Sequence, residues 1–306
     1  MNPSRREFLQ WLAGLGIVAV LRPRIMFAAE RSPILRAIPG SGERLPVIGM
    51  GSWITFDVID DDEAVATRVK VLQTFFDTGG PLVDSSPMYG SSEAVIGHCL
   101  TRIQNQERLF AATKVWTWFT SLGISQMNRS QALWGVKRFD VMQIHNMLSW
   151  ESHLETLKAW KAAGNIRYIG ITTSHGRRHA ELEQALTRER FDFVQLTYNI
   201  LDREVEQRLL PLAAERGIAV IVNRPFQGGR LFDRVKGKPL PEWARDFDCA
   251  NWAQFFLKFI VSHPAVTCAI PATSRVDHMT ENMGALYGRL PDAGARQRMI
   301  DYVLAL

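Results

Sequence analysis

Two hydrophobic patterns alternate between residues 45 and 287, and this alternation restricts the possible folds of the chain more than any other feature. Short apolar segments rich in Val and Ile are each followed by a stretch of helical periodicity. An extended segment at 45–53 leads into the first strand, and we predict the other strands at 81–84, 109–114, 140–145, 168–172, 192–196, 218–222 and 266–270. The predicted helices lie at 60–76, 93–103, 124–136, 151–163, 179–187, 204–216, 250–261 and 277–287. Eight such strand–helix pairs predict a single-domain α/β fold, a closed (β/α)₈ TIM barrel.

A doubly wound open sheet would show a similar alternation and is the main alternative. Its usual sign is a Gly-x-Gly-x-x-Gly turn between the first strand and the first helix, and this chain lacks it. The barrel is therefore favoured, and a dinucleotide would have to bind in another way. A chain of 306 residues that is 46% hydrophobic suits one large globular domain.

The amino-terminal stretch resembles an export signal rather than part of the fold. Arg5 and Arg6 form a twin-arginine pattern, and the apolar run at 11–21 is too short to span a bilayer comfortably. We predict a twin-arginine (Tat) signal over 1–29, with the Tat export machinery as a partner and the periplasm as the destination. No integral membrane span is then expected in the mature protein. An uncleaved signal that tethers the protein to the membrane is the alternative.

The rest of the chain divides into a linker predicted at 30–44 and the barrel domain predicted at 45–306. Of the formal charge of +5, the residues before Glu30 carry +3, so the remainder is only weakly basic. This balance gives no support to nucleic-acid binding. The three cysteines, Cys99, Cys249 and Cys268, have neither metal-ligand nor disulfide spacing, so we predict buried thiols and no metal site.

Four polar residues stand where successive predicted strands end. Asp84 ends the strand 81–84, and Tyr89 follows five residues later on the loop to the next helix. Lys114 ends the strand 109–114, and His145 ends the strand 140–145. Chemistry in parallel α/β proteins is placed at this face, and a core strand has no structural use for an ammonium group.

These four residues, in this order and on these strand ends, resemble the catalytic tetrad of the aldo-keto reductases. The resemblance covers about residues 45–282 and implies an NADPH-dependent oxidoreductase that interconverts a small carbonyl compound and its alcohol. It implies that Tyr89 is the proton donor and that His145 orients the substrate oxygen. We expect Lys114 to lower the pKa of Tyr89, and Asp84 to keep Lys114 charged.

The resemblance also implies the residues that hold the cofactor. Gln195 matches the glutamine that bonds the nicotinamide amide, and the segment after the last strand resembles the one that binds the adenosine phosphate. The residues predicted there are Thr273, Ser274, Arg275, Glu281 and Asn282. We expect Arg275 to grip the 2′-phosphate and to give a preference for NADPH.

The chain departs from the family pattern at several of these positions. Thr172 and Thr173 replace the usual Ser-Asn pair beside the nicotinamide, and Asn223 replaces the aromatic residue that usually stacks on it. Arg224 adds a positive charge near the barrel mouth, suited to an acidic substrate group, to the cofactor diphosphate or to a nearby acid. His278 stands where an arginine is frequent. These changes bear on cofactor pose and affinity, and they leave the tetrad intact.

Two further functions are consistent with the same residues. Lys114 could form a Schiff base in a barrel lyase or isomerase, although Asp84 and Tyr89 suit a proton relay better. The altered nicotinamide contacts also allow a nucleotide-binding partner protein without turnover. For the substrate site, Trp116, Trp118 and Phe119 predict an open pocket with aromatic walls.

Overall fold

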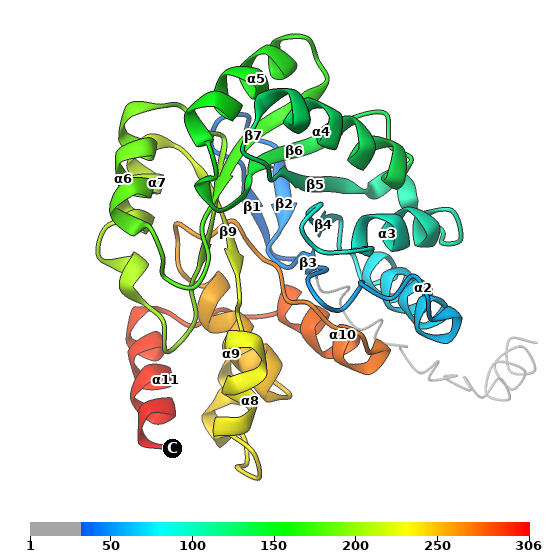
Figure 1. Ribbon diagram of the computed structural model, residues 1–306. Coiled ribbons are helices and arrows are strands. Elements are labelled where there is room, and N and C mark those ends of the chain that lie inside the picture. The colour runs from blue at the N-terminus through cyan, green and yellow to red at the C-terminus, as the bar shows by residue number, and fades with distance from the viewer. Residues whose placement is uncertain (1–31) are drawn as a thin grey trace, which may run out of the picture. The chain divides into compact units, whose positions relative to one another are not determined.

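The computed structural model describes residues 32–306, and the predicted export signal lies outside the described residues. Its main element is an eight-stranded parallel sheet whose neighbours follow chain order from β3 to β10 (Figure 1). The strands are β3 (Met50–Gly51), β4 (Leu82–Asp84), β5 (Phe110–Val115), β6 (Phe139–Ile144), β7 (Ile166–Thr172), β8 (Phe193–Thr197), β9 (Ala219–Asn223) and β10 (Cys268–Ala269).

The first and last strands meet and close the sheet into a barrel. Isolated parallel bridges join Ile48 to Ala269 and Gly51 to Ala272. The amide N–H of Gly49 donates to the carbonyl of Ala269 at 2.8 Å, and the N–H of Ala269 donates to Val47 at 2.9 Å. The predicted (β/α)₈ barrel is thus confirmed, and the ends of β4, β5 and β6 lie on neighbouring strands of one rim.

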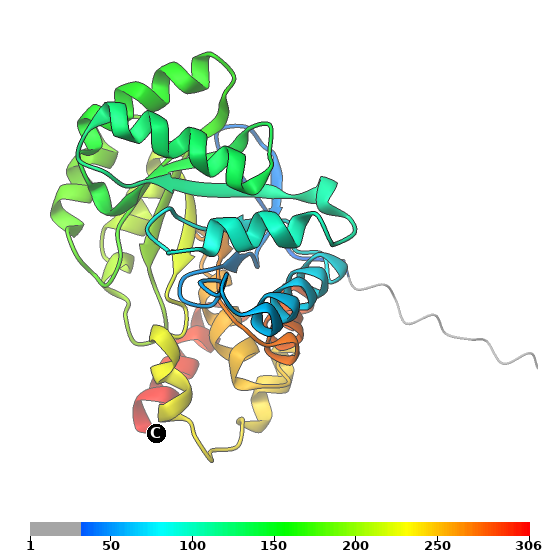
Figure 2. The same ribbon diagram turned by 45° about the vertical axis from the view of Figure 1, so that its right-hand side comes forward.

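Helices follow the strands and cover the outside of the barrel (Figures 1 and 2). They are α2 (Asp62–Asp77), α3 (Ser92–Leu100), α4 (Thr120–Trp134), α5 (Trp150–Ala162), α6 (His179–Arg188), α7 (Leu209–Arg216), α9 (Trp252–Val261) and α10 (Val276–Met283). The first and last of these, α2 and α10, lie side by side, as Figure 2 shows for the blue and orange helices. Their contact closes the outer layer over the place where β3 meets β10.

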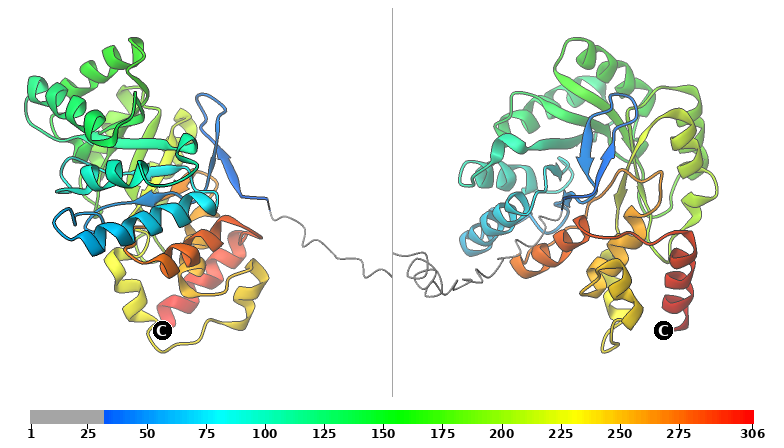
Figure 3. Two further views of the ribbon diagram at one scale, coloured as in Figure 1. Left: turned by 90° about the vertical axis from the view of Figure 1, so that its right-hand side faces the viewer. Right: turned by 180° about the vertical axis from the view of Figure 1, so that it is seen from behind.

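Residues 30–44 were predicted as a linker, and this prediction is wrong for the part that the structure describes. Strands β1 (Leu35–Ala37) and β2 (Arg44–Pro46) pair as an antiparallel hairpin, seen in dark blue from behind in Figure 3. Ile38 and Leu45 join a buried cluster with residues from the amino-terminal parts of the barrel strands, such as Phe110 and Phe193. The hairpin therefore seals this end of the barrel interior, because burying its apolar side chains outweighs the flexibility of the Gly-rich turn.

Two further helices were not foreseen. The segment 226–247, to which the sequence patterns assigned neither helix nor strand, contains α8 (Arg230–Arg234) and short 3₁₀ turns. The tail contains α11 (Ala293–Ala305), which begins where the side chain of Asp292 accepts a hydrogen bond from the N–H of Ala295 at 2.8 Å. All three cysteines are buried, as predicted. Within residues 32–306, the helices are too short or too polar to cross a bilayer.

Candidate active site

Asp84 and Lys114 form an ion pair inside the barrel rim. The ammonium Nζ of Lys114 lies 2.5 Å from Asp84 Oδ2, and it also donates to the carbonyl of Ser85 at 2.7 Å. The side chain of Asp84 is 2% exposed and that of Lys114 is 0% exposed. Burial alone would lower the pKa of Lys114, but Asp84 and Tyr89 together raise it above its ordinary value. Asp84 therefore keeps Lys114 in its ammonium form at a position that is shielded from solvent.

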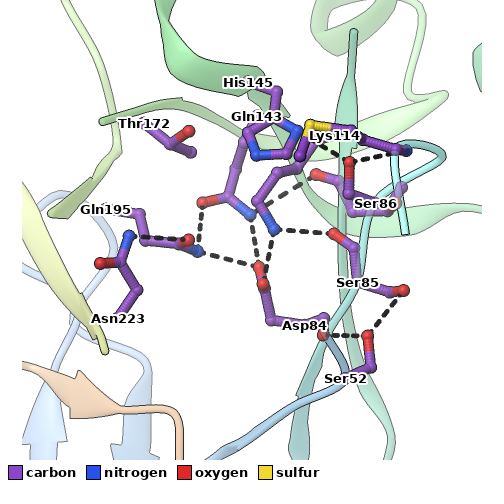
Figure 4. A network of polar contacts seen from close by, with 12 residues as sticks. Ser52, Asp84, Ser85, Ser86, Lys114, Gln143, His145, Thr172, Gln195 and Asn223 are labelled. Atoms are coloured by element: carbon purple, nitrogen blue, oxygen red, sulfur yellow. Dashed lines mark hydrogen bonds and ion pairs between the residues drawn. The ribbon is translucent and has the colours of Figure 1, made fainter. Parts of the chain in front are cut away.

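Three donors converge on the carboxylate of Asp84 (Figure 4). Besides Lys114, the amide groups of Gln143 and Gln195 donate to Oδ1 at 2.8 and 2.9 Å. Gln143 lies on β6 two residues before His145, so both side chains point to the same side of the sheet. We did not predict Gln143 from the sequence, although a polar residue in step with His145 on an apolar strand is a recognisable signal.

A tight loop holds Tyr89 beside this pair. The N–H of Tyr89 donates to the carbonyl of Ser86 at 2.9 Å, and Gly90 follows with φ of 59°. A Cβ on Gly90 would lie 2.3 Å from the carboxylate of Asp57, which accepts hydrogen bonds from both the N–H and the hydroxyl of Ser91 at 2.8 Å. Glycine is required at this position because both the positive φ and the close approach exclude a side chain.

The phenol of Tyr89 has both charged groups close by. Lys114 Nζ lies 5.1 Å from the centre of the Tyr89 ring. Burial raises the pKa of Tyr89 above its usual value, and the attraction of Lys114 offsets this only in part. Lys114 does lower the pKa of Tyr89, as expected, but the net shift is upward because the cost of burying a phenolate is larger. Tyr89 is protonated at neutral pH and is able to donate its proton.

His145 completes the group of four residues predicted from the sequence. Its ring meets the ring of Tyr89 edge to face, with centroids 5.6 Å apart. Burial, and then the charge of Lys114, lower the pKa of His145 well below its usual range, so the imidazole is neutral at physiological pH. Its Nδ1 lies 2.8 Å from the hydroxyl of Ser86, which leaves Nε2 as the remaining polar atom of the ring.

The residues predicted beside the nicotinamide meet one another at the ends of β7, β8 and β9. Asn223 donates to the carbonyl of Thr173 at 2.9 Å and to Gln195 Oε1 at 3.4 Å. The hydroxyl of Thr172 is already engaged, because it accepts the N–H of Asn146 at 2.9 Å. The hydroxyl of Thr173 is buried and has no hydrogen-bond partner among residues 32–306. A ligand amide could satisfy this hydroxyl, so Thr173 fits its predicted role better than Thr172 does.

Arg224 lies on the same rim, directly after β9. Its backbone has φ of 51°, an unusual conformation for a non-glycine residue, and its guanidinium carbon is 5.9 Å from the centre of the Trp53 ring. No carboxylate of residues 32–306 lies within ion-pair distance of this guanidinium. Burial and the like charge of Arg230 lower the pKa of Arg224. This part of the rim is therefore suited to receiving an anionic group.

The segment that is predicted to bind the adenosine phosphate follows β10, and only some of its polar groups are available to a phosphate. The hydroxyl of Thr273 accepts the N–H of Arg275 at 3.1 Å. Arg275 is exposed and is paired through its guanidinium with Asp277, a neighbour whose importance we did not predict. Arg68, which is 8% exposed, donates to the carbonyl of Ser274 at 3.2 Å and was also missed. A 2′-phosphate would have to displace or share Asp277 to reach Arg275.

The last two predicted cofactor residues lie on α10. Glu281 is exposed and Asn282 is buried, so the helix presents only Glu281 to a ligand in this conformation. Near β5, Trp116, Trp118 and Phe119 have exposed fractions of 41%, 70% and 67%. That these rings form the walls of a substrate pocket stays a prediction.

The arrangement suits proton transfer better than covalent catalysis. A Schiff-base lysine must be a neutral amine to attack a carbonyl, and the ion pair with Asp84 holds Lys114 as an ammonium. Tyr89 and His145 instead offer a phenolic proton and a neutral imidazole within one small volume. Among residues 32–306, no group of three His, Cys, Asp or Glu side chains is arranged to hold a metal ion.

Comparison with known proteins agrees with this geometry. Methylglyoxal reductase YeaE of Escherichia coli (strain K12) is 28% identical over 259 residues, which cover 81% of this chain and 88% of that protein. The NADH-specific methylglyoxal reductase of the same strain is 27% identical over 196 residues, 54% of this chain and 58% of its own.

Solved structures and the family model extend the comparison. An aldo/keto reductase from Klebsiella pneumoniae, solved in complex with NADP and acetate, has a TM-score of 0.71 and 21% identity, and the match covers 87% of this chain and 94% of that one. This likeness shows that the two proteins share a fold. The model of the Aldo/keto reductase family matches residues 47–297, nearly the whole described chain. The resemblance inferred from four strand-end residues is confirmed: this chain belongs to the aldo/keto reductase family.

Proposed function

We propose that this protein is an NADPH-dependent reductase that converts a small aldehyde or ketone to its alcohol, or runs the reverse reaction. The observation that carries the proposal is the protonated Tyr89 held beside the buried ion pair of Asp84 and Lys114 and against the neutral ring of His145. A bound nicotinamide nucleotide would supply the hydride, since no side chain can.

The residues of the chain then have distinct roles. His145 Nε2 and the phenol of Tyr89 orient the carbonyl oxygen of the substrate, and Tyr89 gives its proton to that oxygen as negative charge develops there. The ammonium of Lys114 stabilises the phenolate that remains. Asp84 keeps the ammonium charged, and Gln143 and Gln195 hold Asp84 in place. In the oxidative direction, the phenolate removes the proton from the alcohol.

The rim residues fit a nicotinamide nucleotide. The nicotinamide amide would be held by the amides of Gln195 and Asn223 and by the buried hydroxyl of Thr173, which has no partner within the described part of the chain. Arg224, which has no carboxylate in contact among the described residues, suits the diphosphate or an acidic substrate group. Thr273, Ser274 and Arg275, with Glu281 and Asn282, would hold the adenosine part.

The test is direct. Purified protein is mixed with NADPH and a panel of carbonyl compounds, beginning with methylglyoxal because two relatives are named for it. We expect oxidation of NADPH that depends on the carbonyl compound and that Tyr89→Phe abolishes. Tight NADPH binding without turnover of any carbonyl or alcohol would instead favour the non-catalytic partner protein. Turnover that borohydride traps at Lys114 would favour the lyase.

We also propose that the protein is exported to the periplasm by the Tat machinery. The support is the residue pattern around Arg5 and Arg6 and the short apolar run after it. This route exports folded proteins, which suits a protein that must acquire its nucleotide in the cytoplasm, and a bound nucleotide stabilises the fold.

Cell fractionation with nucleotide analysis tests this proposal. Wild-type protein is expected in the periplasmic fraction with nucleotide bound, whereas Arg5→Lys with Arg6→Lys is expected to stay in the cytoplasm. Wild-type protein found only in the cytoplasm would refute the export. Exported protein without nucleotide would refute the loading rationale, and protein in the membrane fraction would indicate an uncleaved tether.

A further inference from the structure

Ser86 contacts the catalytic histidine but has no part in the proton transfer described above. It lies two residues after Asp84 and is fully buried, with an exposed fraction of 0%. Within the described residues, its hydroxyl makes two hydrogen bonds. One joins it to the N–H of Met88 at 3.2 Å. The other joins it to Nδ1 of His145 at 2.8 Å (Figure 4).

The proton on this pair of hydrogen bonds can be located by elimination. The backbone N–H of Met88 can only donate, so the oxygen of Ser86 accepts that bond. The single hydroxyl proton of Ser86 then has one acceptor within reach, Nδ1 of His145. If Nδ1 carried a proton itself, the hydroxyl proton would be buried without a partner, which is costly. The network therefore places the proton of the neutral imidazole on Nε2.

We propose that Ser86 is a positioning residue that fixes the Nε2–H tautomer of His145, so that the imidazole can donate a hydrogen bond to the substrate oxygen. The proposal rests on the reductase function proposed above for the role of that hydrogen bond. The assignment of the tautomer itself depends only on the contacts of Ser86. The opposite tautomer would present a lone pair to the carbonyl oxygen and would repel it.

Two features of the surroundings keep this arrangement in place. The ring of His145 is buried beside the charge of Lys114, and together they keep the imidazole neutral, so that only one nitrogen carries a proton. The N–H of Met88 fixes the rotation of the Ser86 hydroxyl by occupying its oxygen. The loop that carries Tyr89 therefore also sets the proton position on His145. The two groups that would donate to the substrate, Tyr89 and His145, are both held by this loop.

The first experiment measures the tautomer without any substrate. The full chain is labelled with ¹⁵N-histidine, and the ring nitrogens are observed by NMR at pH 7 without nucleotide. The signal of His145 among the 7 histidines is assigned by its loss in His145→Ala. We expect protonated Nε2 and an Nδ1 that accepts a hydrogen bond. In Ser86→Ala the Nδ1 resonance should move to that of a nitrogen without a donor, or the proton should partly move to Nδ1.

A matched control uses the adjacent serine. Ser85 is equally buried, but its hydroxyl accepts from Ser52 at 2.8 Å and does not touch His145. Ser85→Ala should leave the ring nitrogens of His145 unchanged. Protonated Nδ1 in the wild type, or an unchanged Nδ1 resonance in Ser86→Ala, would overturn the proposal.

The second experiment asks whether Ser86 acts through His145. Loss of one buried hydrogen bond predicts a fall in kcat/KM of about three- to tenfold in Ser86→Ala, with the Kd for NADPH unchanged. In a His145→Ala background, the same change should lower kcat/KM less than about twofold, because the group that Ser86 positions is gone. Full additivity of the two changes, or no effect of Ser86→Ala alone, would contradict the proposal. Absence of any carbonyl turnover in the wild type would refute the reductase function instead, and the NMR result would stand.

Discussion

Replacing Asp84 by asparagine tests whether the carboxylate is what keeps Lys114 charged inside the barrel. The change preserves side-chain size and one oxygen, but it removes the negative charge 2.5 Å from the ammonium. The ammonium would keep neutral acceptors, among them the carbonyl of Ser85 at 2.7 Å, but it would have no carboxylate in contact among the described residues. Losing a single charge-assisted hydrogen bond costs about 1.5–3 kcal/mol. Leaving the buried charge uncompensated brings the expected loss in unfolding free energy to about 3–5 kcal/mol.

The pH dependence of stability gives a second, independent signature. In the wild type, the pKa of Lys114 is raised by Asp84 and Tyr89, so the contribution of this group to stability is complete below its unfolded pKa and is lost only as pH rises through the folded pKa. In Asp84→Asn, only Tyr89 still opposes the effect of burial, and we expect the pKa of Lys114 to fall below its unfolded value. The unfolding free energy of the variant should therefore rise as pH increases from 7 to about 10, the ordinary pKa of lysine. Over the same range, Lys114 should not change the unfolding free energy of the wild type.

The assay is urea denaturation followed by tryptophan fluorescence at pH 7 and pH 9.5, with midpoint and slope compared. Glu155→Gln is the control, because it breaks an ion pair with Lys158 in which the two side chains are 72% and 42% exposed, and it should barely move the midpoint. If the unfolding free energy of Asp84→Asn is within about 1 kcal/mol of the wild-type value and has the same pH dependence, the claim that Asp84 keeps Lys114 charged is refuted.

Three further predictions follow from the site. Tyr89→Phe removes the proton donor and keeps the ring, so turnover should fall at least ~10²-fold while the Kd for NADPH stays constant; substantial turnover would rule out Tyr89 as the acid. Asp277→Asn frees the guanidinium of Arg275, so NADPH should bind up to about tenfold more tightly while the affinity for NADH is unaffected. Arg275→Ala should weaken the binding of NADPH alone. Isothermal titration with both nucleotides measures these affinities, and equal changes for NADPH and NADH would mean that the Arg275–Asp277 pair is only structural. Gly90→Ala places a Cβ against the carboxylate of Asp57 at positive φ, so it should lower both the melting temperature and turnover; unchanged values for both would show that the loop has room to rearrange.

The strand ends were predictable because each depends on a short local pattern. Asp84, Lys114 and His145 all follow apolar runs, and parallel strands place their ends on one rim whatever the details of packing. The pKa of Tyr89 could not be predicted in the same way. Its direction depends on how much water the closed loop excludes, which outweighs the charge of Lys114.

Contacts between distant loops were beyond the reach of sequence reasoning. The hydrogen bond from Arg68 to the carbonyl of Ser274 joins residues 206 positions apart, and no periodicity connects them. The pairing of Arg275 with Asp277 is local, but only side-chain geometry shows that the carboxylate reaches the guanidinium. The helix α11 was missed because Gly294 weakens its pattern, although Asp292 supplied a capping signal.

The join between β3 and β10 has a consequence for how the barrel moves. Each of these strands has two residues, whereas β6 and β7 share a register of five paired positions. Local opening is expected where the fewest backbone hydrogen bonds must break together, so amide hydrogens at Gly49 and Ala269 should exchange with solvent sooner than those in β6. Such breathing would loosen the loop at Thr273 first. The ion pair between Asp84 on β4 and Lys114 on β5 would stay formed while the hydrogen bonds between β3 and β10 break and re-form.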